Sequence, residues 1–544
     1  MKKRVLAAIV SCAITASLFA GCAAAGGTAA APAAPAEAAE AAAESVEEAA
    51  EEVTEAAAEA VEEVTETAEA AAEWDGDITE IKVILSDIRG VAEHADHVVA
   101  AMNEITESTI GVHADILFVG MGDYATQVGL ALASGEQVDI CSLGFGSTSF
   151  NGMYANGQLT DLTDLLAEEA PGLLEEMGDY IYADSVNGRI YGVPPFRNYA
   201  SSAYLIMRTD ILEELGLLEK AKALTKWSEF EEIMAEVDEK TDVTPLGDGN
   251  ETPYQLGIIF NGDEFTDSIS FDWLGDTYQV VYTDENGVIS SLPEFEPYRV
   301  GLERVRGWYD KGWIYKDAPT TSDHVDTIMK TGVTFATIQT SEIGVETAKM
   351  EATGYPITCV ELQKNVVGSS AVSRFGLAVP ITAEEPEAAA RWLNALYTDP
   401  RLENLIVWGL EDTDYVVKDG VAAYPDNVTA ANVTYHSVDF MYGNYFNALP
   451  WEGNTADFRQ VSMDNLLAAP VSPYLGFAIN LGDLSDVVAM QYSVNDQYLR
   501  TITNGCYTDE VYDNYLAALA TADLDVYLAA FQDQLDAWKA ANGK

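Results

Sequence analysis

The sequence predicts an α/β protein of at least two domains, the first of them built on a parallel sheet flanked by helices. The chain has 544 residues, which is too long for one hydrophobic core. Apolar strands alternate with helices over residues 78–143, the order expected of a parallel sheet. The stretch Asn187–Met207 contains a strand, the rigid pair Pro194-Pro195 and a second strand. This stretch is either a crossing between two lobes or an ordinary surface β-turn-β unit.

The first 21 residues have the pattern of a secretory signal peptide. A Lys-Lys-Arg start is followed by an apolar run that is too short to span a membrane. The run ends in LFAGC at residues 18–22, which resembles a bacterial lipobox. That resemblance implies cleavage before Cys22 and attachment of lipid to Cys22. The alternative is plain secretion with cleavage at a nearby alanine.

Residues 22–73 form a low-complexity segment rich in Ala and Glu. The segment holds 14 glutamates and no Lys or Arg. Glutamates at helical spacing repel one another when no basic partner is present, so any helix here is marginal. We expect a disordered, solvated tether that holds the folded part away from a membrane.

The charge of the chain is strongly negative, at −61 from 89 acidic and 28 basic residues. Such a chain is not expected to bind nucleic acid or an anionic lipid surface through charge. The five cysteines are far apart and form no CxxC pair, so they indicate neither a zinc site nor a disulfide framework. We expect Cys141, Cys359 and Cys506 to be buried free thiols.

No motif in the sequence indicates catalysis, a cofactor or a metal site. The chain lacks GxSxG, HExxH and P-loop signatures, and residues 284–287 are expected to form a turn, since they lack the acidic series of a calcium loop. His94 and His97 have helical spacing beside Glu93, but a solvated helix end explains them more simply. Acids are so abundant that two of them lying close together is no evidence for a glycosidase.

The elements of the folded part follow in order from hydrophobic periodicity. The expected first-lobe elements are strands at 78–85, 113–118 and 138–143 and helices at 96–106 and 124–133. A later helix begins near Trp227, where Ser228 and Glu231 are expected to form a capping box. Its inner stripe is Phe230, Ile233, Met234 and Val237, and the corresponding stripe of the return helix is Ala389, Trp392, Leu393 and Leu396.

Several segments together resemble the family 1 extracellular solute-binding proteins of ABC importers. They are LALASGEQVDICSLGF with YANGQLTDLTDLL, NGRIYGVP, LTKWSEFEEIMAEV and FGLAVPITAEEPEAAARWLNALYTDP. Four C-terminal segments resemble the lipoprotein subgroup that carries an extension of uncharacterised function: LENLIVWGLEDTDYVV, YGNYFN, SPYLGFAIN and YLAAFQDQLDAWK. The resemblance covers Ile78 to Lys544.

The resemblance implies an α/β protein with the two-lobed, type II periplasmic-binding-protein-like fold. Each lobe is expected to be a mostly parallel sheet flanked by helices, and a hinge of several strands is expected to join the lobes. The first lobe holds residues 74–194 and 374–404, and the second lobe holds 195–373 and 405–544 with the C-terminal extension. The chain is expected to cross the hinge near Pro194–Tyr199, Val366–Ser373 and Val407–Asp412.

The implied function is that of a monomeric, lipid-anchored binding protein on the extracytoplasmic face of the cell membrane. It captures a small solute, a sugar or oligosaccharide, between its lobes and delivers it to the transmembrane subunits of an ABC permease. Peptides are the alternative class of ligand. The other function classes are a lipid-anchored carbohydrate-active enzyme and a ligand-sensing surface lipoprotein without a role in transport.

Candidate binding residues lie after strand ends and at the hinge, because open α/β sheets bind ligands beyond the carboxyl ends of their strands. They are Ser147, the hinge residues Arg197, Tyr199 and Tyr204, then Trp273 and Glu342, and finally Trp408 and Glu411 after the return helix. Arg197 is alternatively an interlobe ion pair, and Trp273 and Trp408 are alternatively core residues.

Overall fold

The structure is a computed structural model that describes residues 74–90, 94–247, 262–265, 272–275, 281–283, 286–321, 323–429, 432–480 and 482–543. The expected signal peptide, the lipidation site Cys22 and the tether lie outside these residues. The segment Glu73–Lys544 forms one unit. No helix in its described residues combines the length and the apolar character needed to cross a membrane.

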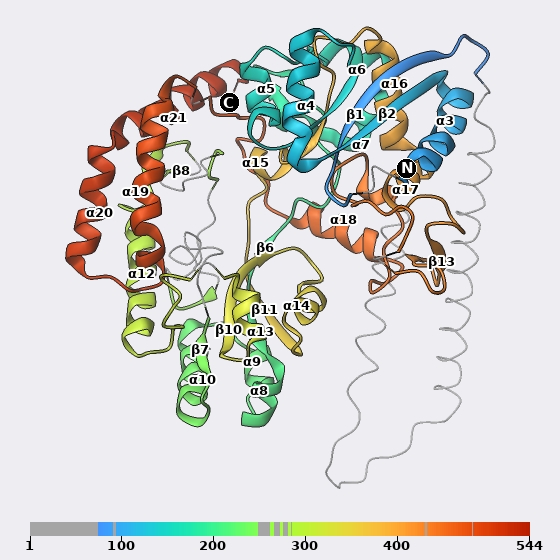
Figure 1. Ribbon diagram of the computed structural model, residues 1–544. Helices are drawn as coiled ribbons and strands as arrows, with labels where there is room; N and C mark the ends of the chain where they lie inside the picture. The colour runs from blue at the N-terminus through green and yellow to red at the C-terminus, as the bar shows by residue number, and fades with distance from the viewer. Residues whose placement is uncertain are drawn as a thin grey trace, which may run out of the picture. The chain divides into compact units, whose positions relative to one another are not determined.

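The sheet of the first lobe has the strand order β12-β3-β1-β2 (Figure 1). Its strands are β1 (Thr79–Asp87), β2 (Val112–Gly120), β3 (Ile140–Leu143) and β12 (Gly376–Ala378). β1 pairs in parallel with both β2 and β3, whereas β12 runs antiparallel to β3. The predicted β-α-β-α-β order is confirmed, and the return strand β12 comes from a distant part of the chain.

Helices cover both faces of this sheet. Helices α3 (Asp96–Ile110) and α16 (Pro386–Thr398) pack on one face and α4 (Met121–Ser134) packs on the other. The lobe is completed by α5 (Phe150–Ala155), α6 (Thr163–Glu169), α7 (Pro171–Met177) and α17 (Pro400–Trp408). The expected inner stripe of α16 is confirmed, because Ala389, Trp392, Leu393 and Leu396 are all fully buried in the first core.

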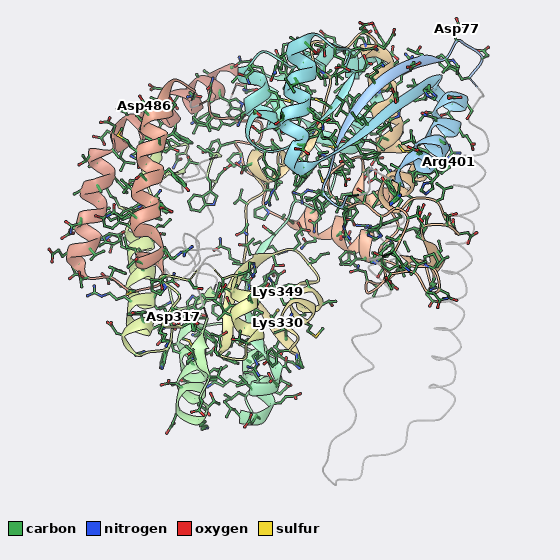
Figure 2. The ribbon with its side chains drawn as sticks, in the orientation of Figure 1. Asp77, Asp317, Lys330, Lys349, Arg401 and Asp486 are labelled. Atoms are coloured by element: carbon green, nitrogen blue, oxygen red, sulfur yellow. The ribbon has the colours of Figure 1, made fainter. Side chains whose placement is uncertain are left out.

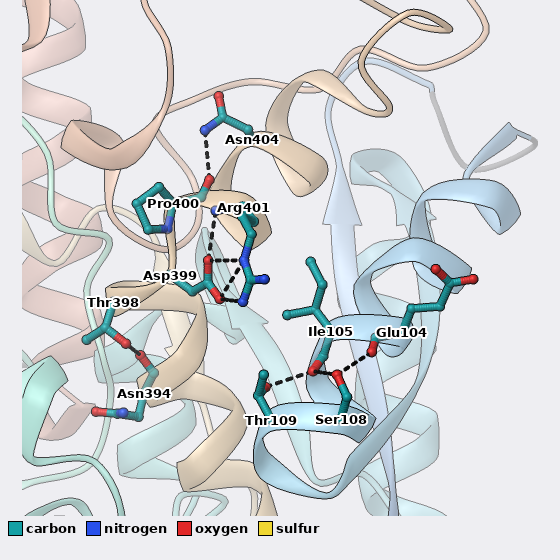
Figure 3. A network of polar contacts seen from close by, with 10 residues as sticks. All are labelled: Glu104, Ile105, Ser108, Thr109, Asn394, Thr398, Asp399, Pro400, Arg401 and Asn404. Atoms are coloured by element: carbon teal, nitrogen blue, oxygen red, sulfur yellow. Dashed lines mark hydrogen bonds and ion pairs between the residues drawn. The ribbon is translucent and has the colours of Figure 1, made fainter. Parts of the chain in front are cut away.

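Local polar contacts separate α16 from α17 (Figure 3). Pro400 lacks the N–H that a continuous helix would need, so α16 ends before it. Asp399 caps the new helix by accepting a hydrogen bond from the Arg401 backbone N–H at 2.9 Å, and the Arg401 guanidinium pairs with the same carboxylate at 2.6 Å. Asn404 donates to the Pro400 carbonyl at 2.7 Å, which steadies the first turn of α17.

The sheet of the second lobe has the order β11-β6-β10-β7. Its strands are β6 (Ser202–Arg208), β7 (Thr244–Leu246), β10 (Thr334–Ser341) and β11 (Ile357–Lys364). β6 is antiparallel to both neighbours, and only β10 and β7 pair in parallel. The expectation of a mostly parallel second sheet is therefore wrong. β6 leaves the hinge at Ser202, whereas β10 and β11 both run back toward it.

The helices of the second lobe are α8 (Thr209–Leu215), α9 (Leu218–Lys222), α10 (Trp227–Lys240), α13 (Val325–Lys330) and α14 (Val345–Thr353). The expected stripe of α10 is confirmed, since its four residues are fully buried. The expected capping box is wrong, because Ser228 donates its hydroxyl to Asp263 and Glu231 accepts from Trp308. Lys349 of α14 (Figure 2) donates to Asp326 of α13 at 2.8 Å.

Residues 405–475 pack mainly with the first lobe, which corrects the expected boundary. The hairpin β13 (Val416–Lys418) and β14 (Val421–Ala423) and helix α18 (Phe458–Ala468) belong to this segment. Tyr415, Tyr435 and Tyr442 are buried in the first core. The chain therefore does not cross between lobes near 407–412. Short bridges join Val193 to Leu377 and Val367 to Val471, so the chain passes the hinge region again near residue 471.

The C-terminal helices form a third core on the second-lobe side. The elements are α12 (Glu296–Asp310), α19 (Ser485–Thr503), α20 (Asp509–Thr521) and α21 (Leu524–Ala541), with the hairpin β8 (Val281–Thr283) and β9 (Ile289–Ser291). Tyr298 and Leu302 of α12 pack in this third core, whereas Val305 and Trp308 of the same helix pack in the second-lobe core. One helix thereby joins the extension to the second lobe (Figure 1).

Candidate functional site

A pocket of about 520 Å³ lies between the hinge, the first lobe and the second lobe. Two of its lining residues come from the first lobe, where each follows the end of a strand. Ile88 comes directly after β1, and Phe145 comes after β3. A third lining residue, Glu342, directly follows β10 of the second lobe. The short helix α15 (Ser369–Val372) precedes the hinge residues Arg374 and Phe375 that also line the pocket. This interlobe pocket has the position that an open α/β sheet offers to a ligand.

A row of aromatic rings forms the apolar side of the interlobe pocket. The rings of Phe145 and Phe375 meet edge to face with centroids 5.4 Å apart, and Phe375 and Phe440 follow at 5.6 Å. Phe145 leaves 52% of its surface exposed. An exposed aromatic ring beside polar groups offers an apolar face on which a ligand can stack.

Arg197 connects the hinge to the second lobe. Its guanidinium lies 3.4 Å from Glu342 and donates to the backbone carbonyls of Asn198 at 3.1 Å and Ala371 at 3.2 Å. It also lies over the Tyr199 ring at 5.3 Å. These contacts hold the guanidinium in place, and the ion pair joins parts of the chain that belong to different lobes.

Glu342 is recessed in the pocket although 56% of its side chain is exposed. The surrounding protein removes water from the carboxylate and raises its pKa, whereas Arg197 and Arg374 oppose that shift. Arg374 itself is exposed at the pocket wall. The carboxylate therefore has two nearby cations and a side open to solvent.

Asp439 is the second acidic residue that lines the interlobe pocket, and the guanidinium of Arg459 holds its carboxylate in place. The buried Arg459 donates to Asp439 at 2.8 Å and to the backbone carbonyl of Ala448 at 2.9 Å. Its guanidinium also stacks on the Tyr445 ring at 3.7 Å, which orients that ring along the pocket wall. Phe458 lines the pocket from the start of α18, close to Gly344 of the second lobe.

The structure brings Arg197 and Glu342 together in the interlobe pocket, as two of the candidate binding residues. Tyr199 and Trp408 lie in the first core instead, each 4% exposed. The Trp408 indole donates to the Leu449 carbonyl at 3.1 Å and its ring packs on Trp451. Both residues have the surroundings of core side chains.

The remaining candidates do not line this pocket. Ser147 is exposed in the short 3-10 turn Gly146–Thr148, and Glu411 is exposed after α17. Tyr204 is half-buried in β6, where it faces Glu361 of β11 and Gln339 of β10. Trp273 packs against the third core.

Sequence reasoning missed most of the aromatic and charged lining. Phe375 and Arg374 adjoin the return strand, and Phe440, Tyr445 and Asp439 come from the segment that was expected in the other lobe. The YGNYFN motif at 442–447 was the available signal, because tyrosine, phenylalanine and asparagine cluster there outside any predicted helix or strand.

The described residues contain no group of three or more His, Cys, Asp or Glu side chains arranged to hold a metal ion. His97 instead lies 2.7 Å from the buried carboxylate of Asp414. Cys141 is buried, and burial raises the pKa of its thiol to about 12. Cys359 and Cys506 are also free, but they are only partly buried.

The polar groups of the interlobe pocket balance one another. Two arginines, Arg197 and Arg374, face two acids, Glu342 and Asp439, beside the aromatic row. Such a wall can offer charged hydrogen-bond donors and acceptors to hydroxyl groups without attracting a strongly charged ligand.

Residues 100–411 match the family model described as bacterial extracellular solute-binding protein. A protein of Streptococcus pneumoniae named carbohydrate ABC transporter substrate-binding protein is 26% identical over 426 residues, which are 76% of this chain and 81% of that protein. The N-glycan transport solute binding protein of Streptococcus pneumoniae has a crystal structure with a TM-score of 0.68 at 22% identity, covering 84% of this chain and 98% of its own. A solute-binding protein from Bifidobacterium longum infantis, titled as binding HMO, has a TM-score of 0.62 at 17% identity, covering 85% and 99%. The family match spans more than half of the chain, and the protein therefore belongs to the bacterial extracellular solute-binding proteins.

Proposed function

We propose that this protein captures an uncharged oligosaccharide in the interlobe pocket and delivers it to an ABC permease. The observation that carries the proposal is the aromatic row Phe145, Phe375 and Phe440 beside a charge-balanced polar wall. A sugar ring has an apolar C–H face that stacks on an aromatic ring and hydroxyls that both donate and accept hydrogen bonds. The name of the Streptococcus pneumoniae relative supports the same ligand class.

The charges of the pocket favour a neutral ligand over a peptide. Glu342 faces Arg197, and Asp439 is paired with Arg459. The ammonium terminus of a peptide would have to displace Arg197 or Arg459 from one of these carboxylates and leave that arginine without compensation. A hydroxyl can join the existing pairs as an additional partner, because a carboxylate or guanidinium has more hydrogen-bonding positions than one ion pair uses.

Closure of the two lobes is the signal that we propose the permease recognises. The ligand would contact Phe145 on the first lobe and Glu342 on the second lobe at the same time. A ligand that touches both lobes binds the closed arrangement more tightly than the open one, so it shifts the population toward closure.

The location that we propose is the extracytoplasmic face of the cell membrane, with a monomer anchored through lipid on Cys22. The LFAGC sequence at residues 18–22 supports the anchor, and the acidic tether at 22–73 supplies reach. Mass spectrometry of the protein from its membrane fraction tests this part. An unmodified Cys22, or an intact signal peptide, contradicts it.

We also propose that the protein does not turn over its ligand. The observation that favours the enzyme alternative is the Glu342 carboxyl in the pocket, because loss of water raises its pKa above the ordinary value, the direction that a general acid requires. Man5GlcNAc and kestose are bound in solved structures of two Streptococcus pneumoniae binding proteins. The purified protein incubated with either saccharide is expected to leave it intact, as measured by mass spectrometry. Hydrolysis that disappears in Glu342→Gln would replace the binding function with an enzymatic one.

Calorimetric titration with Man5GlcNAc, kestose and a neutral tripeptide tests the ligand class. Binding of a saccharide and not of the peptide is expected in the wild type. Phe145→Ala should weaken saccharide binding roughly 10- to 100-fold, because one stacked ring contributes about 1.5–3 kcal/mol. The matched control Leu130→Ala removes an apolar side chain that is 66% exposed on α4 and should change nothing. Equal affinities for the two variants would contradict the proposed site.

A further inference from the structure

A second pocket, of about 540 Å³, lies where the first lobe meets the C-terminal extension. We name it the extension pocket. One side consists of α5 and the turn between β4 (Ser185–Val186) and β5 (Arg189–Ile190), and the other side consists of residues 476–480 and α21. Figure 1 shows α5 and α21 next to each other near the C-terminus. The volume falls in the range of roughly 300–1,000 Å³ that is typical of small-molecule sites.

None of the described residues that line the extension pocket is charged. This is unusual for a chain with a net charge of −61 and 117 charged side chains, 89 acidic and 28 basic. A charged or zwitterionic ligand would lose water there without gaining an opposite charge from these walls. The lining therefore selects against ions, nucleotides and free peptide termini.

The polar groups of the extension pocket are mainly side-chain amides. Asn151 and Asn187 are exposed at its rim, and neither side chain has a hydrogen-bonding partner in the part of the chain that the structure describes. Each amide offers a donor and an acceptor at neighbouring atoms. A pair of neighbouring sugar hydroxyls can satisfy both atoms at once, because a hydroxyl also donates and accepts.

Aromatic side chains supply the apolar surface of this pocket. Tyr154 is half-buried and meets Tyr191 edge to face with centroids 4.9 Å apart. Phe477 and Trp538 pack against each other at 6.1 Å on the opposite side. Both are mostly buried, so they line the pocket as a firm apolar wall. Aromatic walls with amides at the rim suit the apolar faces and hydroxyls of a neutral saccharide.

Hydrogen bonds hold the extension side of this pocket in place. Gln534 of α21 accepts from the Asn480 backbone N–H and donates to the Asn480 carbonyl, both at 2.8 Å. The Gly476 N–H donates to the Ser369 hydroxyl at 2.9 Å, which ties the extension to α15 at the hinge. A site that is held in shape before binding spends less free energy on ordering its side chains.

We propose that the extension pocket is a second binding site, which takes a short uncharged saccharide independently of the interlobe pocket. The proposal rests on the proposed function only for the chemical class of the ligand, because its residues are separate from those of the interlobe pocket. The binding groups are the amides of Asn151 and Asn187 and the ring of Tyr154, with the Phe477–Trp538 wall behind them.

A blocking substitution tests the site without removing core contacts. Ala537 lines the extension pocket and is exposed, so Ala537→Tyr fills the pocket from the α21 side. Ala529→Tyr is the matched control, because Ala529 is exposed on the same helix and does not line the pocket. Asn151→Ala with Asn187→Gly is the second variant. Asn187 has φ of 52°, which glycine adopts without strain.

The measurement is calorimetric titration of the full chain with Man5GlcNAc and with kestose, for wild type and for each variant. Two sites are expected in the wild type with at least one saccharide. Ala537→Tyr should abolish one of them, and the double asparagine variant should weaken that site at least tenfold. Phe145→Ala should affect only the other site, and Ala529→Tyr neither.

The possible failures are distinguishable. A single site that is lost in Phe145→Ala and unchanged in Ala537→Tyr overturns the extension pocket and leaves the proposed function intact. A single site that is lost in Ala537→Tyr and unchanged in Phe145→Ala supports the extension pocket and overturns the interlobe placement. Absence of binding by any saccharide overturns both proposals.

Discussion

The interlobe pocket and the extension pocket have nearly the same volume, about 520 and 540 Å³, but they differ completely in charge. Two arginines and two acids line the first, whereas no described residue that lines the second is charged. The interlobe pocket lies where the proposed closure would bring the lobes together, and the nearest atoms of its Arg197–Glu342 ion pair are 3.4 Å apart. On the extension side of the other pocket, Asn480 and Gln534 bond to each other and Gly476 bonds to Ser369, at 2.8–2.9 Å.

The difference in charge between the two pockets shows what charged side chains and side-chain amides are each suited to do. Long charged side chains can exchange one partner for another as lobes approach, because their attraction extends over several ångströms. Amides act only at hydrogen-bonding distance and in a narrow range of angles, so they are effective where the frame is rigid. Experiments that perturb charge should therefore separate the two pockets.

The largest expected effect concerns Asp184, a buried acid next to the hinge. Asp184 is fully buried, its carboxylate packs against Gly192 at the hinge, and the next residue, Ser185, lines the extension pocket. Burial raises the pKa of Asp184 to about 7. The folded protein thus holds this proton more tightly than the unfolded chain, whose aspartate pKa is near ~3.9.

It follows that the contribution of Asp184 to stability is greatest below pH ~4 and is lost as the pH rises through about 7. A shift of this size corresponds to about 4 kcal/mol, so Asp184→Asn should flatten the fall of unfolding free energy between pH 5 and pH 8. Denaturant unfolding at four pH values measures it, with Asp123→Asn on α4 as an exposed control. Parallel curves for wild type and Asp184→Asn would show that the carboxyl is not protonated in the fold.

The next effect in size concerns Arg374 at the interlobe pocket. A hydrogen bond from a charged donor contributes about 1.5–3 kcal/mol, so Arg374→Ala should weaken saccharide binding roughly 10- to 100-fold in this pocket. Binding in the extension pocket should stay unchanged, and Arg374→Lys should recover part of the loss. Calorimetry of the two sites measures both effects. Arg401→Ala, which removes an arginine outside both pockets, should leave both affinities at the wild-type value.

The smallest expected effect is the response to salt. Ion pairs at a partly exposed pocket are screened as ionic strength rises, whereas neutral hydrogen bonds and stacking are not. Between about 0.05 and 0.5 M NaCl, affinity in the interlobe pocket should change by roughly two- to fivefold. Affinity in the extension pocket should stay constant. Equal salt dependence at the two sites would remove the distinction between them.

The local parts of the fold were predictable from periodicity, and the long-range parts were not. The buried stripes of α10 and α16 follow from the spacing of apolar residues along one helix. The capping of α10 does not, because Asp263 reaches Ser228 across 35 residues of sequence and replaces the nearby Glu231. The antiparallel pairing of β6 likewise depends on where distant strands return to the hinge.

The same distinction applies to the site. Arg197 and Glu342 were predictable because each stands at a hinge or directly after a strand, where ligands of such sheets bind. Phe440 and Tyr445 were missed because the segment at 405–475 was expected in the second lobe. Its tyrosines pack in the first core, as Tyr435 does, and nothing in their local spacing shows which sheet they cover. Trp408 is the opposite case. Its position at a helix end suggested a surface on which a ligand could stack, but its side chain is buried in the first core.

Helix α12 has a practical consequence for anyone who shortens this protein. Its side chains Tyr298 and Leu302 are covered by the last three helices, while Val305 and Trp308 anchor it in the second lobe. A truncation before Ser485 would expose these aromatic and aliphatic side chains to water, and an exposed apolar patch promotes aggregation. The C-terminal region is therefore needed to cover helix α12, and expression trials should retain the chain to Ala541.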